Sequence, residues 1–379
     1  MTMASTTPPE QSLLDQALDR LRGILPDYWQ VAREDPGPAG VQGSSPNAFV
    51  HISAESQMGQ LLVEARQRFA PRDVDTVLGG HAELIRRAAG NVPVMVVAPW
   101  FSPRSRELLM KAGMNYLDLA GNVRIALRYP SLFVERVSPA PGPRTRQSTM
   151  SLRGVKAGRV VRLLADVIPP YGILDLAAAA GVTPGYMSRL IDMLDREALV
   201  ERTRRGGVTD VDWPELLRRR VESYSVLETN EASRWACPNG AAFAWELAHD
   251  VRPPILATGS FAAEQIVHVA QPTLLLMYAM GDVEEFVRYA NLIPADEGAN
   301  VILLTPYDEV ISQRTSAWLT GELPPIRPVA ACSQLVLDCL SGPGRMPAEG
   351  EALLTWMAEN QSRWRLPSLD SLRGSATTP

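Results

Sequence analysis

Apolar residues recur with helical spacing in the middle of this chain, where residues 156–213 read KAGRVVRLLADVIPPYGILDLAAAAGVTPGYMSRLIDMLDREALVERTRRGGVTDVDW. Helices are predicted at 159–167 and 173–180, because Pro and Gly interrupt the spacing after each of them. A third helix is predicted to begin at Pro184, with Thr183 as its N-cap. The second and third helices have the apolar spacing of a helix-turn-helix.

Two short β-prone runs follow the third helix, at residues 199–203 and 208–211, and a Gly-Gly pair lies between them. This pattern predicts a β-hairpin. Arg204 and Arg205 would stand at its tip, where guanidinium groups suit bidentate contact with phosphate. Three helices and a basic hairpin together predict a winged helix-turn-helix, which places one helix in the major groove of double-stranded DNA.

The residues expected to contact DNA fall into two groups. The outward side chains of the third helix would read base edges, and this group is Thr183, Tyr186, Ser188 and Arg189. Basic side chains of the hairpin and of the first helix would meet phosphates, and this group is Arg202, Arg204, Arg205, Arg153, Lys156 and Arg159. Guanine is the expected base partner of Arg189. The predicted site needs neither a metal nor a cofactor.

Strands and helices alternate on both sides of the winged helix, which predicts an α/β multidomain protein. Three domains are expected, at residues 11–137, 152–225 and 230–365. The strands predicted in the outer domains are residues 49–52, 60–66, 94–98, 114–119, 123–127, 132–137, 255–257, 273–278 and 300–304. The helices predicted there are residues 12–25, 74–89, 103–112, 259–266, 283–290, 334–340 and 350–359.

The net charge of −5 is unusual for a nucleic-acid-binding protein until it is divided along the chain. Residues 153–224 hold 12 Lys or Arg and 10 Asp or Glu, a net charge of +2, so the rest of the chain carries −7. That local excess predicts moderate non-specific affinity for DNA. The three cysteines lack CxxC spacing, and no apolar run approaches the roughly 18 residues of a membrane span. We expect a cytoplasmic protein without a zinc site.

The N-terminal domain carries one pattern that suggests catalysis. Glu64-x-Arg66 on a predicted strand has the spacing of Glu-x-Lys in restriction-endonuclease-like nucleases, where two carboxylates hold Mg²⁺ and the lysine orients water. The preceding strand has no acidic residue, and arginine does not change its protonation state as lysine does. We expect a degenerate, non-catalytic domain with Glu64 and Arg66 facing solvent. Asp118 and Asn122 flank a turn and are expected to bind backbone groups.

The C-terminal domain has a similarly incomplete pattern. Gly259-Ser260 after a strand resembles the Gly-Ser turn of nucleotidyltransferases, whose next strand carries Asp-x-Asp for two metal ions. The next strand here, residues 273–278, has no acidic pair. We therefore expect a degenerate nucleotidyltransferase-like domain without catalytic activity.

Several segments resemble the AbiE-type antitoxins of type IV toxin–antitoxin pairs and the related helix-turn-helix regulators of actinobacteria. Besides the winged helix they are VEARQRFAPRDVDTVLGG (63–80), SRELLMKAGMNYLDLAGNVRIAL (105–127), ATGSFAAEQI (257–266) and SQLVLDCLSGPGRMPAEGEALL (333–354). The resemblance implies a repressor that binds its own operator through Thr183–Arg189 and Arg204–Arg205. It also implies a domain that neutralises a nucleotidyltransferase-like toxin. In the short antitoxins the winged helix is N-terminal, whereas here it is central and an α/β domain precedes it.

The residues as a whole predict a sequence-specific DNA-binding transcriptional regulator that is not an enzyme. Many such proteins bind palindromic sites as homodimers. Two other interpretations stay open. A metal-dependent nuclease would need a second acidic residue near Glu64. A protein-interaction module would use the winged helix to bind protein and the acidic third domain to neutralise a partner.

Overall fold

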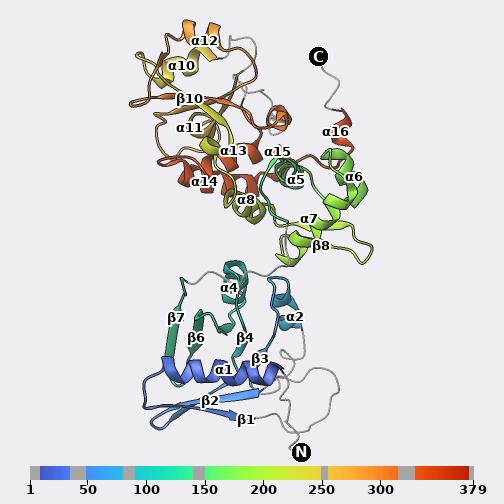
Figure 1. The fold of residues 1–379 in the computed structure, drawn as a ribbon, viewed down its shortest axis with the longest axis vertical. Coiled ribbons are helices and arrows are strands. Elements are labelled where there is room, and N and C mark those ends of the chain that lie inside the picture. The colour runs from blue at the N-terminus through green and yellow to red at the C-terminus, as the bar shows by residue number, and fades with distance from the viewer. Residues whose placement is uncertain are drawn as a thin grey trace, which may run out of the picture. The chain divides into compact units, whose positions relative to one another are not determined.

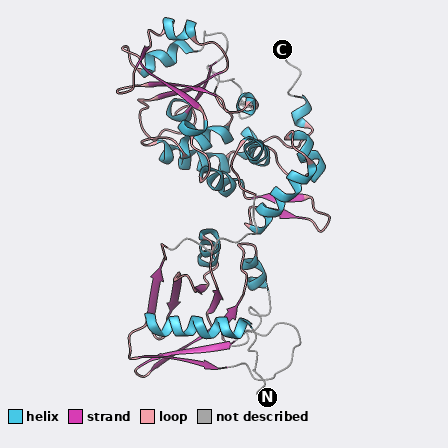
Figure 2. Ribbon diagram, in the orientation of Figure 1, coloured by secondary structure: helices cyan, strands magenta, loops and turns pink. Residues whose placement is uncertain are grey.

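The computed structural model describes residues 9–34, 48–79, 90–139, 150–248, 255–314 and 329–374. Over these residues the chain forms a mixed α/β, multidomain structure, as the sequence predicts (Figures 1 and 2). It divides into two compact units, Met1–Gln147 with Arg196–Ala198, and Ser148–Asp195 with Leu199–Pro379. The first unit holds the expected N-terminal domain, and the second holds nearly all of the other two.

A seven-stranded sheet, with its strands side by side in chain order, forms the first unit (Figure 1). The strands are β1 (Trp29–Glu34), β2 (Ala48–Ala54), β3 (Gln57–Ala65), β4 (Val94–Ala98), β5 (Asn115–Asp118), β6 (Val123–Leu127) and β7 (Leu132–Arg136). The central strands β3, β4 and β5 are parallel, and every other neighbouring pair is antiparallel. Each predicted strand of this domain is present, and β1 is an addition that the sequence did not predict.

Alternation along the strands gives the sheet two apolar faces, because successive side chains point to opposite sides. On one face, Val63 and Val97 lie in a core with buried residues of α1 (Pro9–Ile24). On the other, Leu62 and Val96 share a core with α2 (Asp73–Gly79) and α4 (Pro103–Lys111). The predicted helix at 74–89 is described as far as Gly79, and its remainder lies outside the described residues.

The second unit begins with the three helices and the hairpin predicted from the central sequence. They are α5 (Val155–Asp166), α6 (Ile173–Ala179), α7 (Pro184–Arg196), β8 (Val200–Arg202) and β9 (Val208–Val211), and α8 (Trp213–Val221) follows them. Strands β8 and β9 pair antiparallel. Tyr171 adds a bridge to this hairpin: its N–H donates to the Val208 carbonyl (3.1 Å), and its carbonyl accepts a bond from the Val208 N–H (3.0 Å).

A five-stranded sheet, ordered β11-β12-β14-β10-β13, completes the second unit. Its strands are β10 (Glu231–Ala236), β11 (Ile255–Thr258), β12 (Leu275–Ala279), β13 (Ile293–Pro294) and β14 (Val301–Thr305). The helices around it are α9 (Val226–Thr229), α10 (Ala241–Leu247), α11 (Gly259–Ala263), α12 (Glu284–Tyr289), the 3₁₀ turn η2 (Glu309–Ser312), α13 (Cys332–Leu340), α14 (Met346–Glu359), α15 (Gln361–Trp364) and α16 (Ser371–Gly374). Only β12 and β14 are parallel neighbours among the described strands of this sheet.

The expected boundary between the second and third domains does not separate two hydrophobic cores. One hydrophobic core runs without a break from Leu152, ahead of α5, to Trp364 at the end of α15. Trp213 of α8 packs edge-on against Trp364, with ring centroids 4.9 Å apart. Residues 152–225 and 230–365 therefore fold around the same core.

Asp338 on α13 is the centre of a polar network inside this core. Its side chain is fully buried and accepts hydrogen bonds from the hydroxyls of Tyr224 (2.6 Å), Thr258 (2.6 Å) and Tyr278 (2.8 Å), and from the amide of Gln334 (2.8 Å). Burial raises the pKa of Asp338, and the donated hydrogen bonds oppose that rise. Strands β11 and β12, helix α13 and the residues after α8 meet at this carboxyl group, and they come from both expected domains.

We expect Asp338→Ala to lower the free energy of unfolding of the second unit by about 3–5 kcal/mol, because four buried donors lose their acceptor. The raised pKa means that the folded state binds the proton of Asp338 more tightly than the unfolded chain, in which Asp has a pKa of about 3.9. This proton binding stabilises the folded state fully at pH values below the unfolded pKa, and the stabilisation is lost as pH rises through the folded pKa.

Urea unfolding at pH values from about 4 upward tests this sign, with Asp338→Asn as the matched variant that has no such titration. The free energy of unfolding of the wild type minus that of Asp338→Asn should fall as pH rises. A difference that grows with pH would show that the four donors favour the ionised form.

Candidate nucleic-acid interface

The N-terminus of α7 is built as its sequence requires. Thr183 accepts a hydrogen bond from the Tyr186 backbone N–H through Oγ1 (3.3 Å), which makes it the N-cap, and Pro184 is the first helical residue. The predicted inner side of the helix is buried; it comprises Met187, Leu190, Ile191 and Leu194. On the opposite side of α7, Gly185, Arg189 and Asp192 are exposed.

That outer side presents Arg189 to solvent. Arg189 is exposed and forms no hydrogen bond or ion pair with any residue that the structure describes. Tyr186 and Ser188 are only half-buried. Tyr186 packs against the core and burial raises its pKa, so its ring is in part a structural group. Of the four side chains predicted to read bases, Arg189 has the longest reach into solvent.

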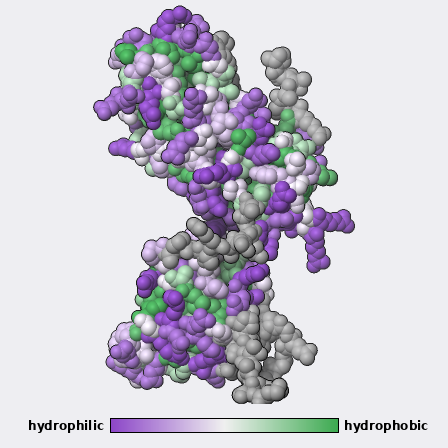
Figure 3. Space-filling view, viewed as in Figure 1, coloured by the Kyte–Doolittle hydropathy of each residue, from purple (hydrophilic) through white to green (hydrophobic). Residues whose placement is uncertain are grey.

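The hairpin tip is a tight turn between Thr203 and Gly207. The Thr203 N–H donates to the Gly207 carbonyl (2.8 Å), and Gly207 returns a bond from its N–H to Thr203 Oγ1 (3.1 Å). Gly206 has a φ of +91°, a conformation that favours glycine. The turn leaves Arg204 and Arg205 exposed at the end of the hairpin, and hydrophilic side chains project over this region (Figure 3).

An ion pair joins the hairpin to α7. The Arg202 guanidinium bonds the carboxylate of Asp192, which lies one helical turn beyond Arg189 on the exposed side of α7. Arg202 also approaches the Gly206 carbonyl. In this structure the Arg202 guanidinium is thus paired within the protein, and its predicted phosphate contact stays a prediction. The pair holds the hairpin beside the face of α7 that carries Arg189.

Arg159, also predicted to contact phosphate, forms an ion pair within the protein. Its guanidinium forms a two-bonded pair with the carboxylate of Asp308, with Nε–Oδ2 and Nη2–Oδ1 distances of 2.7 and 2.9 Å. The Asp308 side chain is 1% exposed, and its hydrogen bonds raise the pKa of Arg159. Arg159 therefore anchors α5 to the segment that follows β14.

Further contacts hold α5 to the same segment. Arg162 is fully buried and donates to the carbonyls of Val310 and Gln313. Gly158 permits the close approach: a Cβ at that position would lie 2.6 Å from the hydroxyl oxygen of Tyr307. No local sequence pattern predicts these contacts, because 148 to 151 residues separate the hydrogen-bond partners along the chain.

Five basic side chains of the central region are exposed and have no ion pair among the described residues; they are Arg153, Lys156, Arg189, Arg204 and Arg205. Internal contacts involve Arg159, Arg162, Arg202, Arg218, Arg219 and Arg220.

The two candidate catalytic patterns do not form metal sites in the described part of the chain. Glu64 is half-buried, not solvent-facing as predicted, and Arg66 occupies its carboxylate (Nε–Oε1 2.7 Å). Asp118 accepts bonds from the backbone N–H groups of Phe101 (2.9 Å) and Asn122 (2.8 Å), which confirms its predicted structural role. The described residues contain no group of three or more His, Cys, Asp or Glu suited to a metal ion.

Around the Gly-Ser turn of the second unit the polar groups bond one another. The Ser260 hydroxyl donates to the Glu349 carboxylate (2.7 Å), and burial raises the pKa of Glu349. The neighbouring Thr258 hydroxyl donates to Asp338. Gly259 has a φ of +65° and lies against Met346 and Leu276, so the turn packs on α14 and β12. These contacts give Ser260 a packing role at the start of α11.

Comparison of the chain with models of known families, with curated proteins and with solved structures found no match. Among the described helices, none is both long and apolar enough to cross a membrane.

The Arg159 pair can be tested on the intact protein. We expect Arg159→Ala to lower the free energy of unfolding by about 1–3 kcal/mol, because the buried Asp308 carboxylate loses its cation while solvent screens part of the loss. Lys156→Ala on the same helix should stay within about 0.5 kcal/mol of the wild type in the same urea titration. Equal stability of the two variants would contradict a structural role for Arg159.

Proposed function

We propose that this protein is a sequence-specific DNA-binding regulator whose α7 enters the major groove while the β8–β9 hairpin contacts the neighbouring phosphates. The observation that carries the proposal is the Asp192–Arg202 ion pair, because it keeps the exposed Arg189 and the hairpin on one face of the molecule. A helix and a basic hairpin presented together match the geometry with which winged helices bind a duplex.

The chemistry of the exposed side chains supports base reading by α7 and phosphate contact by the hairpin. Arg189 has a planar guanidinium that is suited to the O6 and N7 acceptors of guanine. Arg204 and Arg205 supply charge for phosphates, and Arg153 and Lys156 at the start of α5 are further exposed cations. Thr183 and Ser188 offer hydroxyl groups near the first turns of α7.

The remainder of the molecule is assigned a non-catalytic role in this proposal. The sheet of the first unit is taken as a degenerate endonuclease-like scaffold and the five-stranded sheet as a degenerate nucleotidyltransferase-like one. The absence of a free carboxylate at Glu64 supports the first of these. Neutralisation of a toxin and homodimer formation stay predictions, the first from the family resemblance and the second from the symmetry of many DNA sites.

Arg189→Ala should weaken binding to the cognate site by about 1–3 kcal/mol and flatten its sequence preference, because the base contact is lost. The cognate site is obtained first by selecting genomic fragments that the full chain retains. Arg219→Ala removes the same charge from α8, where Arg219 pairs with Glu222, and is the matched control. Equal loss of affinity in both variants would exclude base reading by Arg189.

The double variant Arg204→Ala, Arg205→Ala should weaken binding to every DNA sequence alike. The slope of log affinity against log salt should become shallower by about 2, since two phosphate contacts are removed. Gel-shift titrations at several salt concentrations measure this slope. An unchanged slope would remove the hairpin from the proposed interface.

A further inference from the structure

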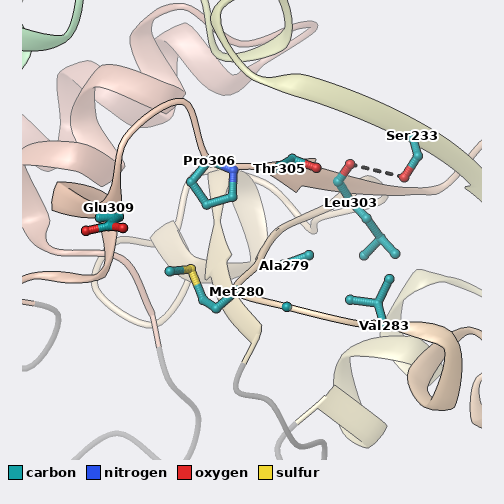
Figure 4. A pocket seen from close by; sticks show the side chains of 9 residues that line it. Ser233, Ala279, Met280, Val283, Leu303, Thr305, Pro306 and Glu309 are labelled. Atoms are coloured by element: carbon teal, nitrogen blue, oxygen red, sulfur yellow. Dashed lines mark hydrogen bonds between the residues drawn. The ribbon is translucent and has the colours of Figure 1, made fainter.

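A pocket of about 400 Å³ lies in the second unit where the parallel strands β12 and β14 end (Figure 4). The last residues of these strands, Ala279 and Thr305, both line it. Ligands of open α/β sheets bind outside the carboxyl ends of parallel strands. The volume is also within the roughly 300–1,000 Å³ of small-molecule sites.

The pocket wall is mainly apolar; its apolar residues are Ala279, Met280, Val283, Leu303 and Pro306. Ser233 is already engaged, because its hydroxyl donates to the Leu303 carbonyl (3.3 Å) and accepts from Trp235 Nε1 (2.9 Å). Glu309 is exposed, and its carboxylate has no hydrogen bond or ion pair with a described residue. Glu309 lies with Met280 and Pro306 at one end, away from Val283 and Ser233 (Figure 4).

We propose that this pocket binds a small, largely apolar molecule that carries one protonated amine. The ammonium group would pair with the Glu309 carboxylate, and the apolar body would lie between Met280, Leu303 and Val283. A mostly apolar wall supplies affinity by burial, and a single charged group fixes the orientation of the ligand. An anionic molecule of the same size would meet the carboxylate and be rejected.

The segment that lines one end of the pocket also contacts α5, and we extend the proposal to regulation through this contact. Pro306 and Glu309 line the pocket, while Asp308 between them pairs with Arg159 of α5. The Val310 carbonyl, next along the chain, accepts from Arg162. Movement of this loop on ligand binding would act on α5, the first helix of the DNA-binding part. This consequence rests on the proposed function, whereas binding of the amine does not.

The test uses the full chain with methyl-labelled methionine and three probes of similar size: 2-phenylethylammonium, 2-phenylethanol and 3-phenylpropionate. The Met280 methyl resonance, identified with Met280→Leu, should move saturably with the amine and least with the carboxylate. Glu309→Gln should weaken amine binding about fivefold and leave the alcohol unchanged. Glu285→Gln, an exposed α12 carboxylate outside the pocket, is the control and should change neither.

Equal binding of the amine and the carboxylate, an unaffected amine affinity in Glu309→Gln, or no saturable movement of the Met280 methyl would overturn the site. Regulation is measured separately, as hydrogen exchange of the α5 amides and as DNA affinity, each with and without the amine. Changed exchange without any DNA binding would support the site and refute the proposed function. Unchanged exchange and unchanged DNA affinity at saturating amine would refute the regulation alone.

Discussion

The second unit depends on the buried guanidinium of Arg162. Its burial lowers its pKa, since surroundings of low polarity disfavour the charged form. The cation is met by the carbonyls of Val310 and Gln313 and lies 3.8 Å from the carboxylate of Asp166. A buried cation without such partners would cost several kcal/mol. Helix α5 and the segment after β14 must therefore be in place together.

This requirement explains why the expected DNA-binding domain has no separate core. Helix α5 packs its apolar side chains against α6 and α8, and its polar side chains contact the segment 307–314. Its partners therefore come from both the early and the late parts of the second unit. The network at Asp338 likewise joins the two expected domains, because Tyr224 comes from one and Thr258 from the other. The exposed face of α7 is thereby held on a framework that extends to Trp364.

The sequence predicted the helices and the hairpin whose formation depends on residues close together along the chain. Spacing of apolar residues, proline and glycine determine α5, α6, α7 and the hairpin, and exposure of Arg189, Arg204 and Arg205 follows from their places in these elements. Strand β10 was missed because EASRWA has no regular alternation, although its hydrogen bonds hold it between β13 and β14.

The roles of Arg159 and Arg202 could not be read from the sequence, for a related reason. Both were counted as available cations, but each is paired with a carboxylate that becomes its neighbour only in the folded chain. Asp308 lies 149 residues from Arg159 along the chain, and Asp192 reaches Arg202 only because the hairpin folds back on α7. A count of charges therefore overestimates what a surface offers to DNA.

The close approach of α5 to Tyr307 at Gly158 depends on a few residues that could identify the same packing in other chains. A Cβ at position 158 would lie 2.6 Å from the Tyr307 hydroxyl oxygen, so a larger residue there would require the Tyr307 side chain to shift. Glycine followed by arginine, then a second arginine three residues later, with a distant Tyr-Asp pair, forms a signature of this packing. Chains too divergent to be matched over their length could still be recognised as sharing the architecture by these few positions.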